Sequence, residues 1–363
     1  MFERRLYYHV DWLLIAAIAA LCAIGVAMIF STTHAGANAG LYVRQLYAIG
    51  LGAIALMVCL TIDYRTLAEN SLAIYGGILA LLVGVLLFGT TGGGARRWIE
   101  LPFFNLQPSE FAKVVLALVL AKFFDESRRG SPSAGDLAVG AVLTGMPFVL
   151  IARQPDLGTA VTLVPIFLAI AYLAGMRLRL LGVLLLVGIV LAPVAWQFAL
   201  KDYQKSRIAT FIDPEQDPRG AGYQQIQARI SVGSGGISGK GFLQGTQGQL
   251  RFLPVAWNDF IFSVLAEEQG FVGVLVALAL YLFVIVRSLE AARLAKDRIG
   301  AYLVLGILAT FTFQVIYNIT MSAGLAPVKG LTLPLMSSGG SSVIATLAGF
   351  GLILNVRMRR FTN

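Results

Sequence analysis

Long apolar runs recur along the chain, and short polar links separate most of them. A helix needs about 20 apolar residues to cross a bilayer, so each run is a candidate transmembrane helix. The runs lie near residues 10–30, 42–61, 71–89, 108–124, 136–153, 157–175, 180–199, 260–287, 300–322 and 341–356. The pattern predicts an all-α polytopic membrane protein with about ten transmembrane helices, forming a single membrane domain over residues 1–363. One connection, residues 200–259, is long and rich in glycine and charge.

The composition agrees with this assignment. Of the 363 residues, 57% are hydrophobic and 13% are charged, and the mean hydropathy is +0.78. Soluble globular chains are about 45–50% apolar and about 25% charged. The composition therefore disfavours a soluble enzyme, a disordered chain and an ordinary DNA-binding domain. We expect the net charge of +9 to serve contacts with membrane lipids and not with nucleic acid.

Lysine and arginine are distributed unevenly between the two sides of the predicted bundle. One side carries fifteen of them in short loops and helix ends, and the other side carries six. Because positive charge collects on the cytoplasmic side, both termini are expected in the cytoplasm, with residues 200–259 outside. The six outward residues are Arg44, Arg96, Arg97, Lys113, Arg153 and Lys329. An anionic substrate on the outer face and anchoring to lipid headgroups both explain them.

Histidine and cysteine are too scarce for most metal sites. The two cysteines, Cys22 and Cys59, fall in apolar runs and form no C-x-x-C motif, and the two histidines are His9 and His34. These counts argue against a zinc site, a disulfide framework and a Ser-His-Asp triad. A site for Mg²⁺ or Mn²⁺ built from oxygen ligands remains compatible with the sequence.

Polar motifs flank the third and fourth runs. Arg96 and Arg97, followed by Trp98, suit either bidentate contact with phosphate or an interfacial aromatic and basic belt. Pro108 fits the first position of a helix, and Glu110 is then placed to reach back to the backbone before it. Lys113 can pair with Glu110 at i,i+3. An ionisable residue at this depth usually faces a cavity, which favours a functional role for Lys113.

Two further motifs lie in connections. Gln154, Pro155 and Asp156 form a sharp turn whose chemistry suits a helix N-cap, and that role alone accounts for them. The glycine-rich stretch around Lys240 resembles a nucleotide loop only superficially, because Walker A spacing needs glycine at position 234 and Ser or Thr at position 241. A backbone nest for phosphate oxygens and a flexible surface loop are equally compatible with this stretch.

The last candidate motifs are three acidic residues and a segment rich in glycine and serine. Asp259 enters the eighth run, where it is either an N-cap carboxylate or a general base or metal ligand at the outer surface. Glu267 and Glu268, inside that run, predict polar partners in the bundle interior. Residues 324–342 contain two prolines and repeated glycines, so we expect a re-entrant or surface loop there, with a cavity wall favoured over a packing turn.

Taken in order, these motifs resemble the SEDS family (shape, elongation, division and sporulation proteins). The resemblance covers nearly the whole chain, and the segments Asp11-Trp12 and Gly245-Thr246-Gln247 are more similar to its RodA branch than to its FtsW branch. The motifs that carry it are Arg96-Arg97-Trp98, Gln107-Pro108-Ser109-Glu110 with Lys113, Gln154 to Thr159, the glycines from Gly233 to Gly248, Asp259 to Phe262 with Glu267-Glu268, Leu333-Pro334 and Ser337 to Ser342.

The resemblance implies a fold of ten transmembrane helices and an inverting peptidoglycan glycosyltransferase. Such an enzyme polymerises lipid II at the outer membrane face beside a class B penicillin-binding protein, with Asp259 as general base. The substrate-binding residues that it implies are Arg96, Arg97, Trp98, Glu110, Lys113, Gln154, Lys240, Ser337 and Ser338. A divalent cation, Mg²⁺ or Mn²⁺, could share the contact with diphosphate. The alternatives are a lipid II flippase that uses Glu110, Lys113, Glu267 and Glu268, and a non-catalytic scaffold for the penicillin-binding protein.

The chain departs from the family pattern at four positions. Val255 stands where the family usually has Glu, and Asn258 where it usually has Thr. Lys329 and Ser338 often correspond to Thr and Tyr. The missing acid at position 255 weakens the expectation of a metal site there, whereas Asp259 is retained.

Overall fold

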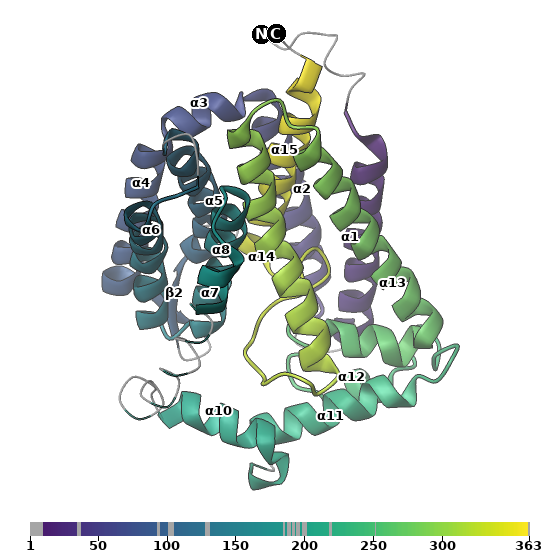
Figure 1. The fold of residues 1–363 in the computed structure, drawn as a ribbon. Helices are drawn as coiled ribbons and strands as arrows, with labels where there is room; N and C mark the ends of the chain where they lie inside the picture. The colour runs from purple at the N-terminus through teal and green to yellow at the C-terminus, as the bar shows by residue number, and fades with distance from the viewer. Residues whose placement is uncertain are drawn as a thin grey trace.

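The protein is a helical bundle, seen here in a computed structural model that describes residues 10–34, 38–92, 95–100, 105–127, 131–183, 202–217, 220–250 and 252–361, together with 186, 190, 193 and 197 (Figure 1). Nine of the ten predicted runs coincide with helices in these ranges. They are α1 (Trp12–Thr33), α2 (Leu41–Thr61), α4 (Ser71–Phe88), α5 (Pro108–Glu126), α6 (Ala134–Arg153), α7 (Leu157–Val161) with α8 (Leu163–Leu173), α13 (Ile261–Arg293), α14 (Arg298–Ser322) and α15 (Gly340–Met358). The predicted run near 180–199 lies largely outside the described residues.

Seven of the described helices are long and apolar enough to cross a membrane, namely α1, α2, α4, α6, α13, α14 and α15. Helix α5 falls short because Glu110, Lys113 and Lys122 add charge to its sequence. The run at 157–175 is divided between α7 and α8 at Thr162. The chain is therefore a helical polytopic membrane protein, as predicted, and the exact count of ten spans is approximate.

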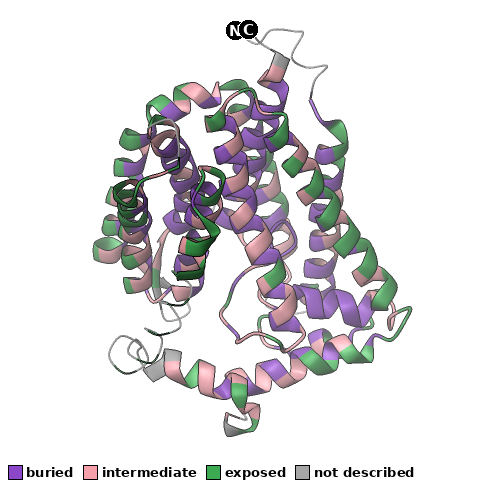
Figure 2. Ribbon diagram, in the orientation of Figure 1, coloured by how far each residue is buried: buried purple, intermediate pink, exposed green. Residues whose placement is uncertain are grey.

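The core lies where α5, α14 and α15 meet, and the outer helices expose apolar faces (Figure 2). In the most apolar stretch of each helix, 89% of the residues of α15 are buried, compared with 22% of those of α2. Close packing of α15 on α2 requires Gly52 and Gly351, because a Cβ at either position would collide with Leu347 or with the Leu56 backbone. Asn355 then donates from Nδ2 to three carbonyls at the end of α2. Small residues and polar side chains thus join these helices, as is usual in membranes.

Charged residues join the elements at one end of the bundle, where α1 begins and α15 ends (Figure 1). Asp11 caps α1 and pairs with Arg287 of α13 and Arg357 of α15. Asp297 caps α14 and pairs with Arg65, which lies in the short helix α3 (Tyr64–Glu69). Hydrogen bonds from Arg65, Tyr64 and the Gly300 amide outweigh burial and lower the pKa of Asp297.

The opposite end is built from the connections. The long segment predicted as a loop contains α10 (Asp202–Ile212), η2 (Pro214–Gln216), α11 (Ala221–Ser234) and α12 (Thr246–Gln249). Helices α10 and α11 lie across this end of the bundle (Figure 1). Strands β1 (Thr90–Gly92), β2 (Ala95–Glu100) and β3 (Asn105–Leu106) form a small antiparallel sheet that pairs Thr91 with Arg96 and Ile99 with Leu106. The sequence pattern did not predict this small sheet, because each of its strands is too short to show a period.

Candidate active site

Asp259 lies in a turn just before α13. The N-cap of α13 is Phe260, and no side chain caps the helix, so the N-cap alternative for Asp259 was wrong. Its backbone is held firmly, because Asn318 of α14 donates from Nδ2 to the Asp259 carbonyl at 2.9 Å and to the Leu331 carbonyl at 2.7 Å. The bundle therefore fixes the position of Asp259 while leaving its carboxylate free of a structural role.

Asp259 is half-buried, and its carboxylate has no hydrogen bond or ion pair among the described residues. Its Oδ1 atom is buried and has no hydrogen-bond partner among the described residues. The loop that carries Gly330 packs against this carboxylate, since a Cβ at Gly330 would lie 3.4 Å from Oδ2, and the positive φ of 62° at this position favours glycine. Burial raises the pKa of Asp259 to about 6, nearby Asp156 adds to the rise, and Arg97 and Arg207 oppose it. A carboxylate with this pKa is a stronger base than an ordinary Asp but is still ionised at neutral pH.

Asp156 and Arg97 lie near Asp259. Asp156 caps α7 as predicted, accepting from the Thr159 amide, and also accepts hydrogen bonds from the Thr159 hydroxyl and from Gln107. Arg97 of β2 approaches the Asp156 Oδ2 atom at 3.4 Å, and its guanidinium lies over the Trp98 ring. The sheet that sequence patterning missed thus carries Arg97 and Trp98 to the site.

These residues line a small polar cavity of about 60 Å³. Its wall includes four of the predicted substrate residues, namely Arg97, Trp98, Glu110 and Ser338, together with Asp156 of the turn before α7. Asn258, the neighbour of Asp259, also lines it, together with Gly330 to Thr332. The cavity is where the separate sequence motifs come together.

Glu110 and Lys113 form the inner part of this region. Lys113 donates to Glu110 at 2.7 Å and to Gln314 of α14 at 3.1 Å, and both charged side chains are buried. This confirms the predicted i,i+3 pair. The expectation that Glu110 would bond to the Gln107 backbone was wrong, because the Gln107 amide donates to Ser341 instead. Glu110 lines the polar cavity and also a smaller cavity beneath it, so the pair extends the polar region inward.

The segment between α14 and α15 forms the other wall. Its residues Leu333, Met336 and Ser337 are buried, and a Cβ at Gly25 of α1 would collide with the Met336 backbone. Ser337 accepts from the Leu333 amide and donates to the Asn258 carbonyl at 2.5 Å. This non-helical backbone is covered by protein, as it must be at membrane depth. The cavity-wall interpretation is thus the one that the structure supports.

Five predicted substrate residues do not line this cavity. Lys113 and Ser337 are next to it, as described above, and Lys240, Gln154 and Arg96 are held elsewhere. Lys240 pairs with Glu267 at 2.6 Å, Gln154 donates to the Leu82 carbonyl, and Arg96 is exposed on β2. Their roles in binding stay predictions. The nest interpretation of the glycine-rich stretch was wrong for the amides of Lys240 and Gly241, which donate to the carbonyls of Glu267 and Glu268. The flexible-loop alternative was wrong for the same residues, which are docked on α13.

Sequence reasoning missed Arg207, Asn318 and Gly330. Arg207 lies on α10, and its guanidinium acts electrostatically on Asp259 although about fifty residues separate them in the chain. Only the folding of α10 across the bundle end brings the two together. Asn318 sits in an apolar run, and an isolated amide there was the one signal that pointed to an internal partner.

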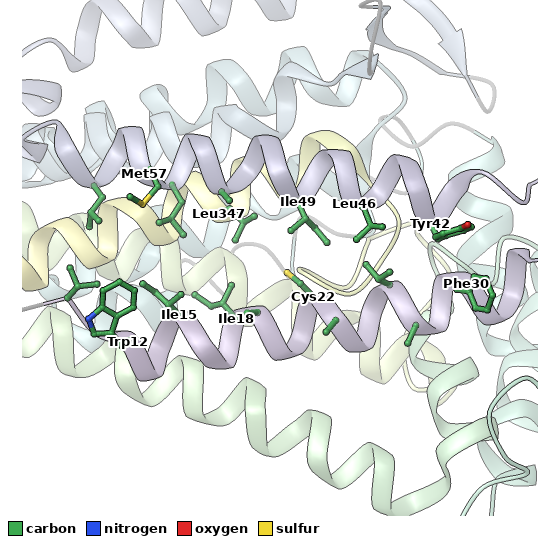
Figure 3. A pocket seen from close by; sticks show the side chains of 18 residues that line it. Trp12, Ile15, Ile18, Cys22, Phe30, Tyr42, Leu46, Ile49, Met57 and Leu347 are labelled. Carbon is green, nitrogen blue, oxygen red and sulfur yellow. The ribbon is translucent and has the colours of Figure 1, made fainter. Parts of the chain in front are cut away.

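A larger cavity of about 880 Å³ lies between α1 and α2 and is almost wholly apolar (Figure 3). Ile15, Ile18 and Cys22 line it from α1, and Leu46 and Ile49 face them from α2. It offers no carboxylate or cation to a sugar or a phosphate. The smaller cavity beside Asp259, by contrast, is lined by charged and polar side chains.

Fold and site together define a polytopic membrane protein with an unpartnered Asp259 carboxylate near Arg97 and Arg207 at one end of its bundle. Residues 6–361 match the family model described as cell cycle protein, which groups FtsW, RodA and SpoVE. The chain belongs to this family, which is the SEDS family that its motifs resemble.

Relatives and solved structures agree. The peptidoglycan glycosyltransferase MrdB of Escherichia coli (strain K12) is 39% identical over 97% of this chain and 94% of its own length. A probable peptidoglycan glycosyltransferase FtsW of Trichlorobacter lovleyi is 38% identical, covering 95% and 92%. A chain in a peptidoglycan synthase complex that coordinates polymerisation and crosslinking has a TM-score of 0.85 at 34% identity, covering 98% and 99%. RodA of Thermus thermophilus has a TM-score of 0.74 at 31% identity, covering 98% of each chain.

Proposed function

We propose that this chain is a peptidoglycan glycosyltransferase that polymerises lipid II, with Asp259 as its general base. Relatives and solved structures named for this activity support the reaction. The observation that carries the assignment of the base is the Asp259 carboxylate, which has a buried, unpartnered Oδ1 atom and adjoins a cavity lined by polar and charged groups. A buried acid that the fold leaves unpaired is typical of a catalytic group.

The reaction is an inverting displacement. The Asp259 carboxylate takes the proton of a sugar hydroxyl on the acceptor lipid II as that oxygen attacks the anomeric carbon of the donor glycan. The bond from this carbon to the lipid diphosphate breaks, and the diphosphate leaves with the electron pair. General-base catalysis supplies about 10²–10⁴ in rate, so positioning of the two sugars must supply much of the remainder.

Cationic side chains are placed to stabilise charge on the leaving diphosphate. Arg97 is the first candidate, because it lines the cavity and also lowers the pKa of Asp259. The Glu110–Lys113 pair lies deeper and is proposed to shape the cavity floor, since Lys113 already has two partners. Trp98 and Ser338 line the cavity and are proposed to contact the sugars or their linkages.

A divalent cation fits this site only in part. No cluster of three Asp, Glu, His or Cys residues exists within the described ranges. Asp156 already accepts from Gln107, Thr159 and Arg97, whereas Oδ1 of Asp259 has no partner. Mg²⁺ often keeps several waters and binds one or two carboxylates together with substrate phosphates. We propose that any bound cation would neutralise diphosphate while held by Asp259, with no protein cage around it.

The partner and the orientation follow from the same reasoning. The solved complex of similar fold supports a class B penicillin-binding protein as partner. We propose that the bundle end with α10, α11 and β2 faces outward across a bacterial cytoplasmic membrane, and that both termini are cytoplasmic, as the lysine and arginine distribution predicts.

The flippase alternative is less well supported than polymerisation. Its four proposed path residues divide into two separate groups: Glu110 pairs with Lys113, and Glu267 and Glu268 bond to Lys240 and Ser31 respectively. Those groups are held by structural partners and line no common cavity in the described part of the chain. The scaffold alternative does not explain why the Oδ1 atom of Asp259 is buried without a partner.

The test is polymerisation of purified lipid II by the chain with and without its penicillin-binding partner, with the products resolved by size. The proposal predicts glycan polymer from the complex and none from the complex that carries Asp259→Ala. Absence of polymer from a folded complex, beside an active control polymerase, would contradict the proposal and shift support to the flippase or the scaffold.

A further inference from the structure

A second cationic group lies at the outer side of the Asp259 region and has no part in the mechanism above. It consists of Arg207 on α10 and Lys329 in the loop after α14. Arg207 donates from Nη1 to the carbonyl of Val328 at 3.2 Å, which places its guanidinium beside the next residue, Lys329. Arg207 interacts electrostatically with both Lys329 and Asp259.

The backbone that carries Lys329 is fixed at several successive points. Tyr317 donates to the Pro327 carbonyl at 2.9 Å, Arg207 donates to Val328, and Asn318 donates to Leu331. The Lys329 carbonyl also packs against α7, where a Cβ at Gly158 would lie only 3.0 Å from it. Lys329 is therefore presented by a rigid segment whose next residue, Gly330, faces the Asp259 carboxylate.

Neither Arg207 nor Lys329 has an ion pair with a carboxylate among the described residues, unlike the three cations that follow. Lys113, Lys240 and Arg287 each pair with a carboxylate. The Lys329 side chain has no hydrogen bond or ion pair within the described ranges, and Arg207 has only a neutral carbonyl partner. Burial, together with the charge of Arg207, lowers the pKa of Lys329. Arg207 is exposed and Lys329 is half-buried, and their like charges repel each other, so an anion bound between them would be stabilised by both.

The charge of this pair suits a diphosphate better than a single carboxylate. Arg207 keeps most of its five N–H donors for a ligand, and a lysine ammonium adds up to three. The pair lies on the α10 side of Asp259, whereas Arg97 approaches it from β2. A sugar attached to a diphosphate held by Arg207 and Lys329 would therefore lie next to the proposed base.

We propose that Arg207 and Lys329 together bind the diphosphate of a lipid-linked sugar substrate beside Asp259. This inference rests on the proposed glycosyltransferase function, because it assigns one of that reaction's two diphosphates to a definite pair of residues. The same pair also suits the phosphate of an anionic membrane lipid, so the test must separate these two sources of phosphate.

The first experiment measures direct binding of farnesyl diphosphate to the purified complex with the penicillin-binding partner, in nanodiscs of neutral phosphatidylcholine. Farnesol serves as the ligand control. Arg207→Gln and Lys329→Gln are each expected to weaken binding of farnesyl diphosphate about tenfold, as expected for loss of a charge-assisted contact. Lys205→Gln removes a charge from the same helix and is expected to leave binding unchanged.

The double variant tests whether one ligand contacts both cations. If one ligand bridges both cations, the double variant should lose less than the product of the two single losses. Equal binding by all of these variants would overturn the proposal. So would a loss seen only in nanodiscs that contain phosphatidylglycerol, with farnesyl diphosphate unaffected, because that result would assign the pair to lipid headgroups.

Two further measurements separate this inference from the proposed function. In lipid II polymerisation, Lys329→Gln is expected to raise KM about tenfold with little change in kcat, because a contact made equally in the ground state and the transition state is lost. An unchanged KM would contradict the inference while leaving the polymerase intact. Asp259→Asn is expected to abolish polymer but to keep binding of farnesyl diphosphate, so a failed polymerase assay does not decide the binding site.

Discussion

Asp259 and Glu267 are two acids eight residues apart, on either side of the start of α13, and the fold treats them in opposite ways. Glu267 is fully buried and accepts hydrogen bonds from Lys240, Ser231 and Thr246, as well as from a backbone amide. The Oδ1 atom of Asp259 is buried and accepts none from the described residues.

The difference shows which of the two acids the fold needs for its own stability. The donors to Glu267 come from α11, α12 and the glycine-rich stretch, so this acid holds the outer connection on α13. The neighbouring Glu268 bonds to Ser31 and joins the same region to α1. Asp259 does not stabilise the fold in this way, because a desolvated carboxylate without full hydrogen bonding is destabilising. Glu267 is a structural clamp, and Asp259 is available for chemistry.

The largest effect is expected when the clamp is removed. Glu267→Ala removes the acceptor of the Thr246 hydroxyl and of the Gln247 amide, and it leaves Lys240 without its carboxylate. The change should lower the free energy of unfolding by about 3–5 kcal/mol. Thermal unfolding of the detergent-purified protein measures this loss. The control is Glu126→Ala, which breaks an exposed pair with Lys122 and should cost less than about 1 kcal/mol. Equal losses in the two variants would contradict the clamp.

Replacing Asp259 is expected to raise the stability of the fold, whereas replacing Glu267 lowers it. Because the folded-state pKa of Asp259 is about 6 and its ordinary value is 3.8, burial of the ionised form destabilises the fold increasingly as pH rises through this interval. Asp259→Asn removes that charge and should stabilise the protein at pH 8 by up to about 3 kcal/mol. The gain should disappear below about pH 3, where the Asp259 carboxyl is protonated in both the folded and the unfolded state. A loss of stability at pH 8 would show that the carboxylate has a structural partner.

Polymerisation should follow the same ionisation. If Asp259 must be ionised to accept a proton, the rate should fall about tenfold for each pH unit below about 6 and level off above it. Initial rates of lipid II polymerisation between pH 4.5 and 8 measure this, with thermal unfolding recorded at each pH to confirm that the complex stays folded. A flat profile, or a rate that rises on acidification, would contradict a base at Asp259.

The smallest effect is expected at Lys240. This side chain is half-exposed, and Glu267 keeps its other donors when the ammonium is lost, so Lys240→Met should cost only about 2 kcal/mol of stability. Lys205→Met is the matched change on the same connection and should be nearly neutral. If Lys240→Met instead left stability intact and raised KM for lipid II, Lys240 would be a substrate contact, as the family resemblance implied.

Local sequence patterns predicted the membrane fold well because length, hydropathy and caps act locally. Nine apolar runs became helices, Asp156 caps α7 and Pro108 begins α5. The pair of Glu110 with Lys113 was predictable for the same reason, since one helical turn brings the two side chains together. These features depend on residues that are close in the chain.

Features that depend on distant residues were not predictable from one sequence. The role of Asp259 could not be separated from an N-cap, because the distinction depends on Asn318 and Gly330 from other elements. Lys240 looked free in a glycine-rich stretch, and only the docking of that stretch on α13 shows its partner, Glu267. Arg207 had no local signal at all, and the small sheet that carries Arg97 is too short for periodicity to show.

The most direct test of the contrast between the two acids measures lipid II polymerisation per folded molecule for Asp259→Asn and Glu267→Gln side by side, in complex with the penicillin-binding partner. The account predicts that Asp259→Asn loses at least about 100-fold in rate while its stability is preserved or raised. Glu267→Gln should lose stability but keep the rate of its folded fraction within about threefold. Normal polymerisation by Asp259→Asn, or an inactive but fully stable Glu267→Gln, would contradict it.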